Sequence, residues 1–97
     1  MSKITRLERM RFSILTNDLT KCFLCGRPKD DIHEIYEGAR RIPSMKYGCC
    51  IPVCRNCHRH LHDDYNFALP YKQICQKKFE ELFSKDKFIE VFKRSYL

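Results

Sequence analysis

Two Cys-x-x-Cys pairs constrain this chain more than any other feature of its sequence. Cys22 and Cys25 form the first pair, Cys54 and Cys57 form the second, and the 28 residues 26–53 lie between them. Each pair can supply two thiolates from one tight turn, and four thiolates complete the tetrahedral shell that zinc prefers. Because this shell leaves no position for water, we expect a structural zinc ion that staples the two turns together.

The length and the cysteine usage predict a single cytoplasmic domain. A chain of 97 residues has a modest core, so a structural metal ion contributes a useful share of its stability. We therefore expect one domain over residues 1–97. Seven cysteines cannot all pair, and the charged N-terminus lacks the apolar segment of a signal peptide, which argues against a disulfide framework. No apolar run reaches the length of about 18 residues that a membrane span needs.

The charge balance predicts a nucleic-acid partner. Lysine and arginine number 19 against 12 acidic residues, which gives a net charge of +7. This excess favours attraction to the phosphate backbone of DNA or RNA. The sequence has no strongly basic amphipathic helix beside a charge-free apolar face, so we do not expect a membrane surface as the partner.

The hydrophobic pattern predicts an α+β fold. Alternation of apolar residues indicates short strands, and apolar residues at steps of three and four indicate helices towards the C-terminus. We expect C-terminal helices within residues 70–97, the first beginning at Pro70 and the last capped by Ser84. The other expected elements are a short helix or disordered arm over residues 3–9, a short hairpin with strands at 10–15 and 19–24, a strand at 31–36, a loop at 37–48, a strand at 50–53 that pairs with 31–36, and a helix at 54–62.

Three histidines can form a second, open metal site. His58 and His62 stack on one face of the predicted helix, and His33 lies on the strand expected beside it. Three protein ligands leave positions for water and for a phosphate oxygen, so a second divalent ion (Mg²⁺, Mn²⁺, Ni²⁺ or Zn²⁺) can polarise a phosphodiester there. His60 is expected on the side of the helix that faces away. Either Glu34 or a histidine outside the metal shell can activate the attacking water.

Basic residues around these motifs are candidates for contacts with the flanking phosphates. They lie in the expected loop and on the expected helix: Arg40, Arg41, Lys46, Arg55 and Arg59.

The run HEIYEGARRIPSMKYGCCIPVCRNCHRHLH between two zinc knuckles resembles the HNH endonuclease family, the ββα-metal class. It is most similar to small zinc-containing HNH-type proteins of bacteriophages and prophages, over about residues 10–82 and most specifically 22–62. The resemblance implies a zinc-stapled ββα-metal core that hydrolyses DNA. It also implies that His33, His58 and His62 bind the catalytic ion.

Two positions differ from the pattern of this family. The residue in the place of the general-base histidine is Glu34, and the place of the orienting asparagine falls near Cys49. One alignment makes Glu34 the base; another makes His33 the base and Glu34 a ligand, and both stay open. The differences leave a second hypothesis beside the nuclease, which is a weak or inactive zinc domain that binds nucleic acid or serves as a phage accessory protein. A homodimer, or a partner protein from the phage or its host, fits either hypothesis.

Overall fold

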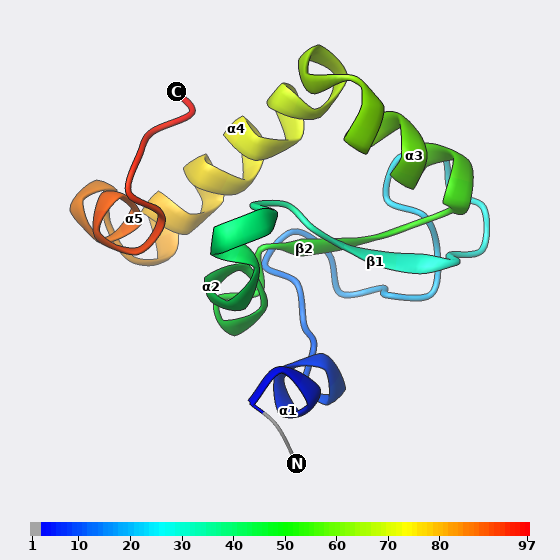
Figure 1. Cartoon of the computed structure of the whole chain (residues 1–97), viewed down its shortest axis with the longest axis horizontal. Coiled ribbons are helices and arrows are strands. Elements are labelled where there is room, and N and C mark those ends of the chain that lie inside the picture. Colours follow the sequence, from blue (N-terminus) through cyan, green and yellow to red (C-terminus); the bar gives the residue numbers. More distant parts are fainter. Residues whose placement is uncertain (1–2) are drawn as a thin grey trace.

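A two-stranded antiparallel sheet lies at the centre of this chain, with helices packed around it (Figure 1). The computed structural model describes residues 3–97, and the predicted α+β class is confirmed. The helices and strands are, in order, α1 (Lys3–Arg9), β1 (Asp31–Glu34), the 3-10 helix η1 (Gly38–Arg40), α2 (Arg41–Lys46), β2 (Cys50–Val53), α3 (Arg55–Asp63), α4 (Tyr65–Leu82) and α5 (Lys85–Phe92).

The sheet joins the two strands expected at 31–36 and 50–53, although the first ends at Glu34. β1 pairs with β2 so that His33 lies opposite Ile51, and every residue of β2 is buried. Pro52 can sit in β2 because a two-stranded sheet leaves one edge of each strand unpaired. The carbonyl of Pro52 accepts a hydrogen bond from the Phe23 amide at 2.8 Å. The sheet therefore also fixes the position of the first Cys-x-x-Cys turn, which contains Phe23.

The predicted N-terminal hairpin was wrong, because residues 10–15 and 19–24 form no strands. Instead of a ladder, the first of these segments makes single contacts with different parts of the fold. The Ile14 amide donates to the Gly48 carbonyl at 2.9 Å, and the Cys50 thiol donates to the Phe12 carbonyl at 3.0 Å. The alternation of apolar residues does not mark a buried face, because Met10 and Phe12 are exposed. The N-terminal segment that does become regular is α1, which packs against α2.

The second of these segments leads into a tight turn at Cys22. The Cys22 amide donates to the Arg27 carbonyl at 2.6 Å, and the Gly26 amide donates to the Cys22 carbonyl at 2.9 Å. Gly26 has φ +78°, the left-handed region that favours glycine, as the knuckle predicted. These bonds close the turn on itself. In place of the expected strand, the segment forms one isolated β-bridge, between Lys21 and Pro28.

The segment predicted as a loop at 37–48 is largely helical, since it contains η1 and α2. Its glycine and proline suggested irregular structure, yet Pro43 occupies the first turn of α2, where a missing amide is tolerated. Gly48 follows the helix at φ +72°. A Cβ at Gly48 would lie 2.5 Å from the Phe12 ring, so another residue would strain the backbone and displace that ring.

Helices α3 and α4 begin where aspartate side chains accept hydrogen bonds from backbone amides of the first turn. Asp30 accepts from the Arg55 amide at 2.8 Å, and Asp64 accepts from the Phe67 amide at 3.2 Å. The predicted start of the C-terminal helices at Pro70 was therefore too late, because Asp64 caps α4 upstream of it. Pro70 lies inside the helix, at the cost of one backbone hydrogen bond.

Aromatic side chains form the core between the sheet and the last two helices. Ser84 caps α5 as predicted, by accepting from the Lys87 amide at 3.0 Å. Phe88 and Phe92 of α5 pack against Phe79 of α4 and against Tyr36, which follows β1. Within residues 3–97, no helix is both long enough and apolar enough to cross a membrane.

Candidate metal centres

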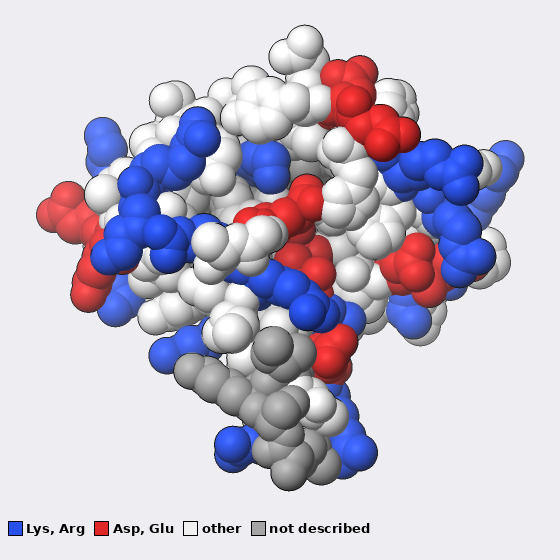
Figure 2. All heavy atoms as spheres, in the orientation of Figure 1, with Lys and Arg blue, Asp and Glu red and all other residues white. Residues whose placement is uncertain are grey.

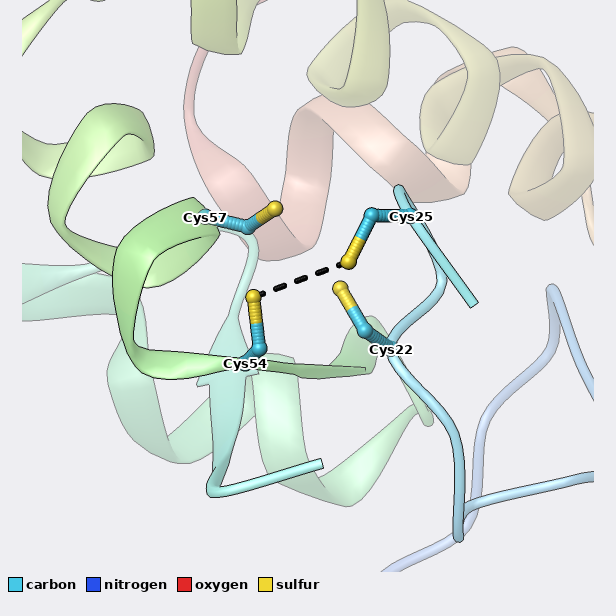
Figure 3. A group of neighbouring side chains, drawn as sticks. All are labelled: Cys22, Cys25, Cys54 and Cys57. Atoms are coloured by element: carbon cyan, nitrogen blue, oxygen red, sulfur yellow. Dashed lines mark hydrogen bonds between the residues drawn. The ribbon is translucent and has the colours of Figure 1, made fainter. Parts of the chain in front are cut away.

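The four cysteines of the two knuckles converge at one point. Cys22 and Cys25 come from the loop before β1, Cys54 lies between β2 and α3, and Cys57 lies in the first turn of α3 (Figure 3). Their sulfur atoms all lie within 4.8 Å of one another. The Sγ atoms of Cys25 and Cys54 are 3.7 Å apart, close to the roughly 3.75 Å expected of two thiolates bound to one tetrahedral zinc ion. The group is therefore compatible with a structural zinc ion.

The protonation of these thiols also fits a metal site. Burial alone would raise the pKa of Cys22, but backbone amides of Cys54, Cys25 and Leu24 lower it to about 6. In contrast, burial and the neighbouring thiols raise the pKa of Cys57 well above its usual value. The lowered pKa favours the thiolate form of Cys22. The other thiols become thiolates when a metal ion binds, because the positive charge of the ion stabilises the deprotonated sulfur atoms.

The three histidines form a second group next to the sheet. His33 projects from β1 and is buried, and His58 and His62 project from α3. One ring nitrogen from each lies within 4.8 Å of the others. The Nε2 atoms of His58 and His62 are 3.1 Å apart, close to the roughly 3.3 Å expected of two nitrogens on one tetrahedral ion. The geometry therefore fits a divalent ion held by one strand and one helix.

Two carboxylates that the sequence reasoning missed contact the outer nitrogens of these histidines. Asp31 Oδ2 lies 3.2 Å from His58 Nδ1, and Glu37 Oε2 lies 2.7 Å from His62 Nδ1. Such partners orient metal-binding imidazoles and select their tautomer. The spacing could have indicated both, because Asp31 shares a strand face with His33 two residues on, and Glu37 follows His33 by four.

His33 is held in the neutral form that binds metals. Burial, followed by the nearby His58, His62 and Lys72, lowers the pKa of His33 to about 3. Its buried Nδ1 has no hydrogen-bond partner within residues 3–97. Because an unsatisfied buried polar atom is costly, coordination of this imidazole is consistent with its surroundings.

Glu34, the predicted base, is not brought to the histidines. Neighbouring residues on a strand point to opposite faces, so Glu34 faces away from His33. Its carboxylate forms an ion pair with Arg11 and lies 3.7 Å from Nε of Arg41. The catalytic role of Glu34 stays a prediction from the family resemblance, and Glu37 is the glutamate that lies at the histidines.

The predicted phosphate-binding residues differ in their availability. Arg41 is partly engaged, because its side chain contacts Glu34 and also lies 3.3 Å from Glu8. Arg40 is half-buried in η1, and no carboxylate within residues 3–97 lies at ion-pair distance from it. The remaining three are exposed: Lys46 at the end of α2, and Arg55 and Arg59 on α3.

His60 does not belong to the histidine group. It stacks on Phe67 with ring centroids 3.6 Å apart and lies 3.7 Å from Asp64, on the α4 side of α3. This placement agrees with the expectation that His60 points away from the other two histidines of α3.

Comparisons of the chain with models of protein families, with curated proteins and with solved structures found no match.

Proposed function

We propose that this protein is a metal-dependent DNA endonuclease of the HNH type, with β1, β2 and α3 as its ββα-metal core. The observation that carries the proposal is the convergence of His33, His58 and His62 from a strand pair and the helix that follows it. The adjacent cysteine group supports a separate structural zinc that holds this core together. A closed shell of four sulfur ligands is expected of a structural ion, and an open shell of three histidines is expected of a catalytic ion.

The proposed chemistry is hydrolysis of a phosphodiester bond. A divalent ion in the histidine site would supply positive charge to polarise the phosphate and stabilise the leaving oxygen. The histidines would hold that ion, and Asp31 and Glu37 would fix the orientation of two of the rings. Glu37 Oε1 lies 3.8 Å from His33 Nε2, beyond hydrogen-bond distance, which leaves this oxygen free to accept a proton from water.

The experiment that tests the nuclease is nicking of supercoiled plasmid by the pure zinc-loaded protein. Mg²⁺, Mn²⁺ or Ni²⁺ is added, with a reaction lacking a second ion and a reaction with EDTA as controls. A variant that carries both His33→Ala and His58→Ala runs beside the wild type. Nicking that needs the added ion and disappears in the variant supports the proposal, whereas nicking that survives in the variant assigns the activity to a contaminant.

A second candidate is a zinc-binding module that binds DNA without cleaving it. The observation that favours it is the engagement of Glu34 by Arg11 and Arg41, which keeps the predicted base away from the histidines. Absence of nicking with every ion, together with salt-sensitive DNA binding, would select this candidate.

Glu37→Gln is expected to weaken binding of the second ion by about 10- to 100-fold, which is typical of losing an outer carboxylate partner of a metal-bound histidine. Isothermal titration of the zinc-loaded protein with Mn²⁺ or Ni²⁺ measures this change. Glu34→Gln is the matched control, since Glu34 pairs with arginines on the other strand face. Equal effects of the two substitutions would contradict the assignment of Glu37 to the histidine site.

Arg40→Ala is expected to reduce the slope of log Kd against log salt for DNA by about 1, the effect of one lost phosphate contact. Arg41→Ala is expected to reduce it less, because this guanidinium already contacts Glu8 and Glu34. Fluorescence anisotropy with a labelled duplex at several salt concentrations measures both slopes. An unaltered slope for Arg40→Ala would place the phosphate contacts elsewhere.

A further inference from the structure

We propose that Arg94 and Tyr96, in the segment after α5, form a phosphate-binding platform that holds the DNA backbone near the histidine site. This inference rests on the proposed function and extends it to the C-terminal segment. Below, a cationic platform means the side chains of Arg94 and Tyr96.

The segment that carries Arg94 and Tyr96 is fastened to α4. The buried Gln76 donates from Nε2 to the Ser95 hydroxyl at 3.0 Å and accepts from the Tyr96 amide at 2.7 Å. Gln73 donates to the Tyr96 carbonyl at 3.0 Å. Before these contacts, Lys93 adopts a left-handed conformation (φ +65°), which ends α5 and turns the chain back. The arginine is thus presented by a backbone of defined position.

Stacked rings connect this segment to the histidine site. The guanidinium carbon of Arg94 lies 4.2 Å from the centre of the Tyr96 ring, and Tyr96 stacks on Tyr36 with centroids 5.1 Å apart. Tyr36 immediately precedes Glu37, the residue that contacts His33 and His62. A cation held over an aromatic face loses less freedom when it binds a ligand, because its orientation is already restricted.

The guanidinium group that lies over this ring has no carboxylate partner. Within the described residues, no carboxylate lies at ion-pair distance from Arg94, in contrast to Arg11 and Arg41. Positive charge that the protein leaves uncompensated favours an anionic ligand, and planar guanidinium groups match the two oxygens of a phosphodiester.

The surface around this region suits a bound backbone. Figure 2 shows acidic side chains gathered in a hollow near the centre of one face, with basic side chains along its margin. Carboxylates beside the histidines would repel the DNA backbone unless cations at the margin bound its phosphates and offset this repulsion. The cationic platform supplies such a cation near this site, because the Tyr96 ring stacks on Tyr36, which precedes Glu37 in the chain.

The test compares Arg94→Gln with Lys85→Gln, a control with the same loss of charge at the other end of α5. Lys85 is exposed and begins that helix. Binding of the full zinc-loaded chain to a labelled DNA duplex is measured without a second divalent ion, at several salt concentrations. We expect Arg94→Gln to reduce the salt slope by about 1. Unchanged zinc content and thermal transition confirm that each variant is folded.

The outcomes separate this inference from the proposed function. A slope for Arg94→Gln equal to that of Lys85→Gln overturns the platform, even if the wild type nicks plasmid. Loss of slope in Arg94→Gln without any nicking by the wild type supports the platform and selects the binding module over the nuclease. Absence of salt-dependent DNA binding by the wild type overturns the platform and both proposed functions.

Discussion

Replacing Cys22 by serine is expected to release the zinc ion and unfold the domain. The four sulfur atoms join the loop before β1 to the junction of β2 and α3, so the site closes the fold between segments distant in sequence. Structural zinc contributes about 10–16 kcal/mol in zinc-finger peptides, which matches or exceeds the total stability of about 5–15 kcal/mol of an ordinary domain. Loss of one thiolate should therefore remove the cooperative thermal transition, as measured by circular dichroism, and the bound zinc, as measured by elemental analysis. Cys57→Ser should give the same result.

Cys75→Ala is the appropriate control for these variants. Cys75 is fully buried in α4 but does not belong to the cysteine group. We expect this variant to lose only about 1 kcal/mol of stability, from one small cavity, and to retain one zinc per chain. A Cys22→Ser protein that keeps a native transition without zinc would contradict the structural role of the ion.

His58→Ala is expected to leave the domain folded and to abolish cleavage, with a fall of at least about 100-fold, more than the loss of an outer partner alone would cause. The His58 side chain is a quarter exposed, and its polar contacts are with Asp31 and His62, so its removal leaves the core and the zinc knuckles intact. Plasmid nicking under metal saturation measures the activity, and the thermal transition measures the fold.

His60→Ala is the matched control, because His60 lies on the same helix, is exposed and points towards Phe67. We expect it to cleave DNA at the rate of the wild type. If His58→Ala and His60→Ala cleaved DNA equally well, His58 would have no part in the reaction.

The sequence predicted those parts of the fold that depend on local spacing. The two Cys-x-x-Cys pairs indicated the sulfur group, and the four-residue step from His58 to His62 indicated one face of a helix. The strand pair at β1 and β2 was expected as a hairpin, and the cap at Ser84 followed from residue type. These features can be predicted from the sequence because each depends on a turn or a backbone repeat of a few residues.

Other local patterns misled because tertiary contacts outweigh them. The apolar alternation around Phe12 suggested a strand, but no neighbouring strand is available to pair with it, and the segment packs against Gly48 and Cys50 instead. The steps of three and four in α4 indicate a helix but do not decide which residues are buried, since Ile74 and Leu82 are about half exposed. The polar residues of α4 that are buried instead make specific bonds: Lys72 donates to the Ile35 carbonyl, and Gln76 binds the C-terminal segment.

The sequence by itself determined the composition of both candidate metal sites, since the identity and spacing of cysteines and histidines set which ligands can meet. Only the tertiary structure decided which charged groups surround them. It brings Glu37 and Asp31 to the histidines, directs Glu34 to Arg11, and stacks Tyr96, whose ring carries Arg94, on Tyr36. The physical reason is that the spacing within each Cys-x-x-Cys turn and between His58 and His62 is set by short-range backbone geometry, whereas the partners of a charge depend on strand facing and on contacts between distant segments.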